Sequence, residues 1–99
     1  MATPHLERFA ELYESGARFV VFDVETVGAS DGQFVVEIGA VEAGRAVAKE
    51  PRSFQKILQF KPASWRPYWA ALKVHGIPTA EIERGAPRTQ TLAAFLEFV

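Results

Sequence analysis

Two acidic residues at the end of a hydrophobic run are the residues of this sequence best placed to do chemistry. The run Phe19–Phe22 predicts a strand covered on both faces, and it leads into Asp23 and Glu25. Because side chains alternate along a strand, Asp23 and Glu25 leave the backbone on the same side. Neighbouring carboxylates repel unless a cation lies between them, and oxygen ligands suit Mg²⁺ or Mn²⁺. The spacing indicates either a divalent metal site or two solvated loop residues.

Several segments around and after these acids form an ordered pattern, namely Phe22–Gly28, Val36–Val41, Lys73–Ile77, Arg84–Pro87 and Leu92–Val99. The pattern resembles the DEDD (DnaQ-like) 3′–5′ exonuclease family, which includes the proofreading subunit of bacterial DNA polymerase III and ribonuclease T. The resemblance runs in the family's order from about Arg18 to Val99. One departure is Val27, where a second Thr is usual in the family. The matching segments are the first motif in Phe22–Gly28 and Val36–Val41, the His-Gly-Ile segment in Lys73–Ile77, and the helix before the second motif in Arg84–Pro87 and Leu92–Val99.

The resemblance implies catalysis by two metal ions held by four acids, with nucleotides removed one at a time from the 3′ end of single-stranded DNA or RNA. Asp23 and Glu25 would be the catalytic metal ligands for Mg²⁺ or Mn²⁺. The family's other two acids are Asp residues of later motifs, whereas this sequence contains only Asp23 and Asp31, and Asp31 lies in a predicted turn. We therefore expect the 99 residues to be a truncated part of an exonuclease and to be inactive alone.

The same resemblance assigns substrate-binding residues. Thr26 and Val27 would approach the terminal nucleotide, and Val74 and His75 would close a pocket around its base. An alternative for His75 is a polar residue at a helix end, before a C-terminal Gly76, which needs no ligand. The expected partners are a single-stranded DNA or RNA 3′ end and, in the parent protein, a DNA polymerase or further domains.

The expected fold is α/β, with a ribonuclease H-like mixed sheet represented by its first three antiparallel strands and flanking helices. Residues 18–99 form this incomplete domain, and residues 1–17 contain a preceding amphipathic helix at Pro4–Glu14 that we expect to pack against the sheet. Pro51 places the third strand at a sheet edge, because proline cannot donate a ladder hydrogen bond. The predicted strands are Arg18–Val24, Phe34–Glu42 and Ala46–Gln59.

Three further helical segments are predicted after the strands. They cover Pro67–Val74, Thr79–Arg84 and a last helix from Thr89. In the last helix the apolar spacing predicts one buried stripe, formed by Leu92, Phe95, Leu96 and Val99.

Glu37 and the aromatic cluster Trp65–Trp69 each allow two interpretations. Glu37 lies among apolar neighbours in the second strand, so it is either a residue beside the metal site or, as we favour, an acid facing Lys56 or Arg52. The cluster could stack on exposed bases, but ordinary packing in the core is favoured in a nearly neutral chain.

Composition narrows the class of protein. The net charge of −1 gives no footprint for extended nucleic-acid binding, and no apolar stretch approaches a membrane span. The absence of cysteine excludes disulfides and is compatible with the cytoplasm, where we place the protein. Two other functions stay open: a non-catalytic nucleic-acid-binding or assembly module with an exonuclease-like fold, and an unrelated α/β domain in which Asp-x-Glu arises by chance.

Overall fold

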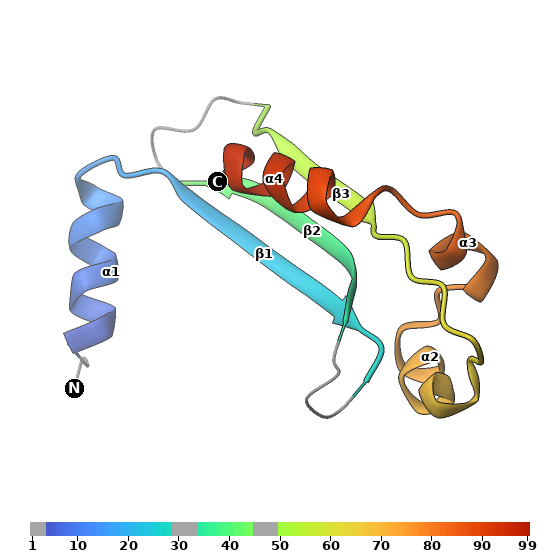
Figure 1. Cartoon of the computed structure of the whole chain (residues 1–99). Helices are drawn as coiled ribbons and strands as arrows, with labels where there is room; N and C mark the ends of the chain where they lie inside the picture. Colours follow the sequence, from blue (N-terminus) through green and yellow to red (C-terminus); the bar gives the residue numbers. More distant parts are fainter. Residues whose placement is uncertain (1–3, 29–33, 45–49) are drawn as a thin grey trace.

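A computed structural model describes residues 4–28, 34–44 and 50–99 of the chain. Within them the protein is mixed α/β, with one three-stranded antiparallel sheet and flanking helices (Figure 1). The predicted turn at Asp31 and the predicted strand residues 46–49 lie outside the described residues. The elements are α1 (Pro4–Glu14), β1 (Phe19–Thr26), β2 (Val35–Ala43), β3 (Ser53–Ile57), the 3₁₀ turn η1 (Arg66–Tyr68), α2 (Trp69–His75), α3 (Thr79–Glu83) and α4 (Arg88–Phe98).

The sheet has the order β1-β2-β3, so β1 and β3 are its outer strands. This confirms the edge position predicted for the third strand, which begins after Pro51 and is shorter than predicted. In the register, Phe22 lies opposite Ala40 and Ala40 lies opposite Phe54, which puts these three residues on one face. The next residue along each strand points to the other face.

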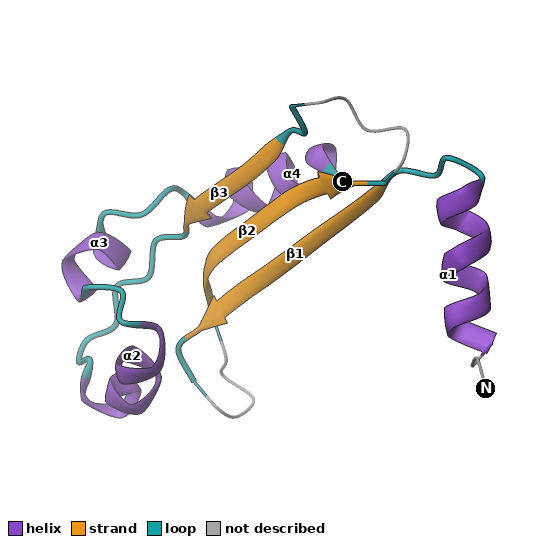
Figure 2. Cartoon of the chain, turned by 180° about the vertical axis from the view of Figure 1, so that it is seen from behind, coloured by secondary structure: helices purple, strands orange, loops and turns teal. Residues whose placement is uncertain are grey.

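Helix α4 covers one face of the sheet, and the other face is open (Figures 1 and 2). The ring of Phe95 contacts Phe22 and Phe54, and the ring of Phe98 also contacts Phe54. The buried residues of α4 are Thr91 and Phe98. Three residues of the predicted stripe, Leu92, Leu96 and Val99, are exposed. The predicted stripe is therefore wrong except for Phe95. Aromatic partners on the sheet, rather than apolar spacing alone, decide which side of the helix faces inward.

Strand β1 is far less covered than its sequence predicts. Val21 is 60% exposed on the open face, and Phe22 is 58% exposed despite its contact with Phe95. The prediction of a strand covered on both faces is wrong for the described part of the chain. Among the described strands only β2 pairs with β1, and the helix over the sheet contacts β1 through the rings of Phe95 and Phe22.

Helix α1 has the predicted bounds but contributes no buried residue. It stands away from the sheet and touches it through the ring of Phe9, whose centroid is 4.9 Å from that of Phe19 (Figure 1). The Cα radius of gyration is 16.9 Å, against about 13 Å for a compact domain of 100 residues. The helix is thus attached at one end of the sheet. The sequence had predicted that it packs against the sheet, and among the described residues this prediction holds only for the contact at Phe9.

The principal core lies where β2 meets the segments after β3. Val27, Val36 and Ile82 are fully buried, and Trp65 and Tyr68 pack against them from the side of α2. Core packing of these two aromatic residues is as favoured from the sequence. Gly85 is needed here, because a Cβ at this position would lie 2.7 Å from the backbone nitrogen of Gln59.

The helices are short. The two longest, α1 and α4, have 11 residues each. None of the helices in the described ranges combines the length and the apolar character that crossing a membrane requires.

Candidate metal site on the open face of the sheet

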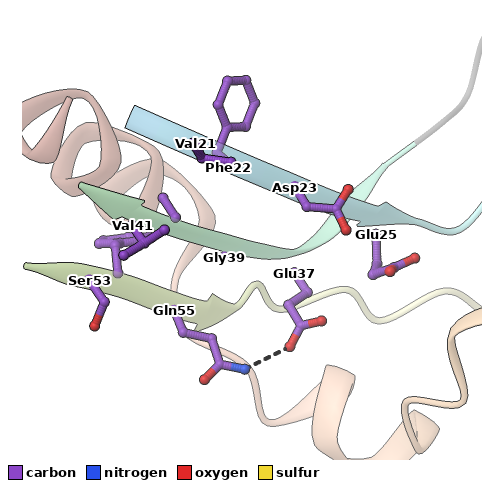
Figure 3. A pocket seen from close by; sticks show the side chains of 11 residues that line it. Val21, Phe22, Asp23, Glu25, Glu37, Gly39, Val41, Ser53 and Gln55 are labelled. Carbon is purple, nitrogen blue, oxygen red and sulfur yellow. Dashed lines mark hydrogen bonds between the residues drawn. The ribbon is translucent and has the colours of Figure 1, made fainter. Parts of the chain in front are cut away.

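The register of β1 and β2 brings three acidic residues to the open face of the sheet. Asp23 lies opposite Gly39, and Glu25 lies directly opposite Glu37. Since residues directly opposite each other in an antiparallel pair share a face, Asp23, Glu25 and Glu37 all project from the side away from α4. Figure 3 shows the three carboxylates along neighbouring strands. The predicted pair on β1 therefore becomes a set of three, to which β2 contributes the third.

These acids border an open hollow of about 430 Å³ that spans all three strands. Gly39 lies in the middle of its floor, next to Asp23 in the register. A Cβ added at Gly39 would have no atom within 4 Å, so the space beside Asp23 is free of protein atoms among the described residues. The hollow therefore leaves room for ligands beside the carboxylates.

Glu37 has one polar partner on the neighbouring strand. The side-chain amide Nε2 of Gln55 donates a hydrogen bond of 3.1 Å to Glu37 Oε2 (Figure 3). The favoured prediction, that Glu37 faces Lys56 or Arg52, is wrong. Lys56 lies opposite Ile38 and so points to the α4 side, and Arg52 pairs with Glu42 instead. The sheet register decides the partner, since only every second residue of β3 shares a face with Glu37.

The three carboxylates form no ion pair with any residue of the described ranges. Like charges directly opposite in a sheet are destabilising, so the Glu25–Glu37 pair disfavours the sheet unless a cation neutralises it. The donors are hard oxygen ligands and fit Mg²⁺ or Mn²⁺ in chemistry. They do not form a complete metal site by themselves. In the described ranges, no three His, Cys, Asp or Glu residues lie close enough together to bind one metal ion.

The residues after Glu25 lead into a second, smaller groove. The side chain of Val27 is fully buried in the core, and its backbone N–H donates to the carbonyl of Phe34 at 3.0 Å. Because the whole residue has no exposed surface among the described residues, neither its side chain nor its backbone is open to a ligand there. Thr26 is half-buried at the bulge that ends β1.

The groove joins the end of β1 to helix α2. It has a volume of about 280 Å³, and Gly28 and Val74 both line it. Val74 is 84% exposed, so its side chain is available to a ligand. The structure thus brings Gly28 beside Val74, whereas Thr26 and Val27, which were predicted to approach a nucleotide, do not line this groove. Its remaining lining residues are Pro67, Tyr68, Ala70 and Ala71.

His75 lies half-buried at the end of α2. Its Nδ1 accepts a hydrogen bond of 3.0 Å from the backbone N–H of Ile77, so the neutral ring carries its proton on Nε2. Nε2 is buried and has no hydrogen-bond partner among the described residues. Gly76 follows in the left-handed conformation and donates to Leu72. This geometry agrees with a polar residue at a helix end, and His75 is absent from the lining of the groove at Val74.

A charged cluster on the α4 side of the sheet was not predicted from the sequence. Arg18 and Arg52 both bind the Glu42 carboxylate, and both guanidinium groups lie over the ring of Phe98. Arg18 also donates to the carbonyl oxygens of Phe98 and Val99 at the end of α4. Hydrogen bonds from Arg18 and then from the Arg52 backbone and side chain lower the pKa of Glu42 from 4.5 to about 2.

Only the register could have revealed this cluster in advance. Val20 pairs with Glu42, which places Arg18 just beyond the end of the ladder. Predicting that pairing requires the length of the connection between β1 and β2 and the position of the bulge after Glu25. The residue types alone do not provide either of these.

Comparison with known proteins adds no family assignment. No model of a known protein family matches the sequence, and no curated protein matches it. The exonuclease resemblance of the first motif therefore stays a prediction, and the case for a function depends on the geometry described above.

Proposed function

We propose that this chain contributes two metal-binding carboxylates, Asp23 and Glu25, to a metal-dependent 3′–5′ exonuclease with a ribonuclease H-like fold. The substrate would be the 3′ end of single-stranded DNA or RNA. The observation that carries the proposal is the placement of both acids on one open face of β1, next to a groove that begins at Gly28. Two aligned carboxylates on one strand, beside a free surface, suit cation-assisted phosphodiester hydrolysis.

In this proposal Asp23 and Glu25 would hold the cations, which supply activation of a water and neutralise charge on the leaving oxygen. The protein would contribute placement. Gly28 and Val74 would flank the terminal nucleotide, and the absence of a side chain at Gly39 would leave room beside Asp23 for a phosphate group. Glu37, held by Gln55, would keep a negative charge opposite Glu25 and so favour a bound cation.

The proposal requires further carboxylates from other parts of the protein. Mg²⁺ needs a nearly complete octahedral shell of oxygens, and two or three carboxylates on one sheet face leave most positions to water. We therefore expect weak binding of Mg²⁺ or Mn²⁺ to the 99 residues and no measurable trimming by them alone. In a protein that adds the missing acids, the same residues would become essential.

Two experiments test the assignment. In the full-length protein, Asp23→Ala should reduce Mn²⁺-dependent removal of 3′ nucleotides by at least about a hundredfold, because a metal ligand is lost. The matched control is Glu81→Ala, which removes an exposed acid of α3. Unchanged trimming in Asp23→Ala would remove this residue from the mechanism.

The 99-residue chain offers a direct test of metal binding. Paramagnetic Mn²⁺ should broaden the amide resonances of Asp23, Glu25 and Glu37 before those of other acids, and Asp23→Asn should weaken this effect. Broadening that is equal at Glu81 would indicate only general attraction of cations to acidic side chains.

A second candidate function is a non-catalytic nucleic-acid-binding or assembly module. It is favoured by one observation, that no group of three potential metal ligands comes together within the described ranges. The two functions differ in the metal experiment, because a module without catalysis has no need of selective Mn²⁺ binding at Asp23.

A further inference from the structure

The charges of this chain are segregated along the sequence in a way that the net charge of −1 conceals. Residues 51–80 contain five Lys or Arg residues and no Asp or Glu, so this segment carries +5 while the rest of the chain carries −6. The acid-free segment includes η1 and α2, which stand beside the end of β1. A positive element next to an acidic face provides the separation of charge that a polyanion and its metal ions would require.

One side of η1 and α2 combines two of these cations with an exposed indole. Arg66, Trp69 and Lys73 are spaced by three and then four residues, so they lie on the same side of the helical segment. We call them the basic stripe. Trp69 is 57% exposed, and Arg66 and Lys73 are also exposed. Within the described part of the chain, neither cation is in an ion pair.

The exposure of Trp69 contrasts with its aromatic neighbours. Trp65 and Tyr68 turn inward and contact the ring of Phe60 at centroid distances of 5.6 and 5.2 Å. Trp69 has no aromatic partner among the described residues and is not part of the core. The fold therefore uses two rings of the cluster for packing and leaves the third with a free face.

We propose that the basic stripe binds the single strand that leads away from the 3′ end, with a base stacked on Trp69 and phosphates held by Arg66 and Lys73. An exposed indole accepts any unpaired base, and flanking cations neutralise the phosphates on either side. The same helix lines the groove at Gly28 through Val74, so one strand could contact both features. This inference rests on the proposed exonuclease function and extends its substrate contacts to nucleotides beyond the terminal one.

The test measures binding of a fluorescent oligothymidylate of about 12 nucleotides to the 99-residue chain in EDTA, so that metal plays no part. Trp69→Ala should weaken binding about tenfold, and Trp69→Phe should keep most of it because a stacking surface remains. Arg66→Ala combined with Lys73→Ala should weaken binding and reduce the salt slope by about 1.4, since each contact with a single-stranded phosphate contributes about 0.7.

The matched controls are Tyr13→Ala and Arg8→Ala, which remove an exposed ring and an exposed cation of α1. Both should bind the oligonucleotide as the unaltered chain does. Absence of binding by the unaltered chain, or equal affinity of the Trp69→Ala and Tyr13→Ala variants, would overturn the inference. Equal competition by polyglutamate would also overturn it, because the stripe would then attract any polyanion.

Failure of the proposed function gives a different result. Trp69-dependent binding without Mn²⁺-dependent trimming in the full-length protein would leave the stripe in place and reject the exonuclease. The opposite result is trimming that needs Asp23 and depends on substrate length in the same way in Trp69→Ala and in the unaltered protein. It would support the exonuclease and reject the basic stripe.

Discussion

Strand β2 carries two glutamates that face opposite sides of the sheet, and their surroundings differ completely. Glu42, on the side of α4, accepts hydrogen bonds from Arg18 and from both the backbone and the side chain of Arg52. Glu37, on the open side, accepts one hydrogen bond from Gln55 and lies opposite a second acid, Glu25. The residue type and the strand are the same, so the difference comes from the face alone.

The comparison separates a structural acid from one that is available to a ligand. The Glu42 carboxylate is surrounded by donors, and its side chain is only 12% exposed, so an added cation would have to displace an arginine. Glu37 has spare acceptor capacity and a like charge across from it, which a cation would relieve. An acidic residue in a sheet is thus a candidate metal ligand when its carboxylate accepts fewer hydrogen bonds than its oxygens could accept.

The largest effect should follow from removing the ring that both arginines cover. Phe98 is 9% exposed and packs on Phe54 as well as under the two guanidinium groups. Phe98→Ala should lower the free energy of unfolding by about 3 kcal/mol, measured by urea denaturation, since a buried aromatic side chain is lost. Leu96→Ala, at a position 72% exposed on the same helix, should change it by less than about 0.5 kcal/mol. Equal effects of the two substitutions would mean that α4 is not held at Phe98.

An intermediate effect should appear as a change in pH dependence. Because the pKa of Glu42 is about 2 in the folded state and 4.5 as the ordinary value, the unfolded state binds the proton first as pH falls. The stabilisation from Glu42 is therefore complete above about pH 4.5 and is lost between about pH 4.5 and 2.

The variant Glu42→Gln measures this contribution. Its urea midpoint should lie below that of the unaltered chain at neutral pH, and the difference should vanish as pH approaches about 2. Glu81→Gln, on the exposed surface of α3, serves as the control and should follow the unaltered chain throughout. A constant difference at every pH would show that the amide disturbs packing rather than the ion pairs.

The smallest effect on stability is expected on the open face. Glu37→Gln should be neutral or stabilising by about 0.2–1 kcal/mol in metal-free buffer, because it removes the like charge opposite Glu25. The same substitution should weaken Mn²⁺-induced broadening at Asp23 and Glu25. A clear loss of stability would place Glu37 with Glu42 as a structural acid and would end the contrast between the two faces.

Local patterns predicted the positions of most elements well, but not the extent of the third strand, which was predicted over Ala46–Gln59 and covers Ser53–Ile57. The helix Pro4–Glu14 has the predicted bounds, and the first two strands differ from the predicted ones by no more than two residues at either end. Alternating and helical periodicities, with Gly and Pro at the boundaries, carry this information because it depends on neighbours in sequence. The alignment of Asp23 with Glu25 followed from the same periodicity.

Contacts between elements were much less predictable. The prediction for the inward face of α4 is wrong at two positions. The hydroxyl of Thr91 donates to the carbonyl of Pro87, so this residue can be buried, whereas Leu96 is 72% exposed. Likewise the partner of Glu37 depended on a register that the sequence does not specify. Hydrophobicity sets how much of a helix is apolar, but the opposing surface sets which residues are covered.

The bare backbone at Gly39 has a consequence for protein design. Position 39 lies directly across from Asp23, and an added side chain there would displace no described atom within 4 Å of its Cβ. A new functional group could therefore be grafted at this one position to extend the carboxylate set without rebuilding the sheet. Position 85 offers the opposite case, since the backbone of Leu58 and Gln59 already occupies the space that any side chain would need.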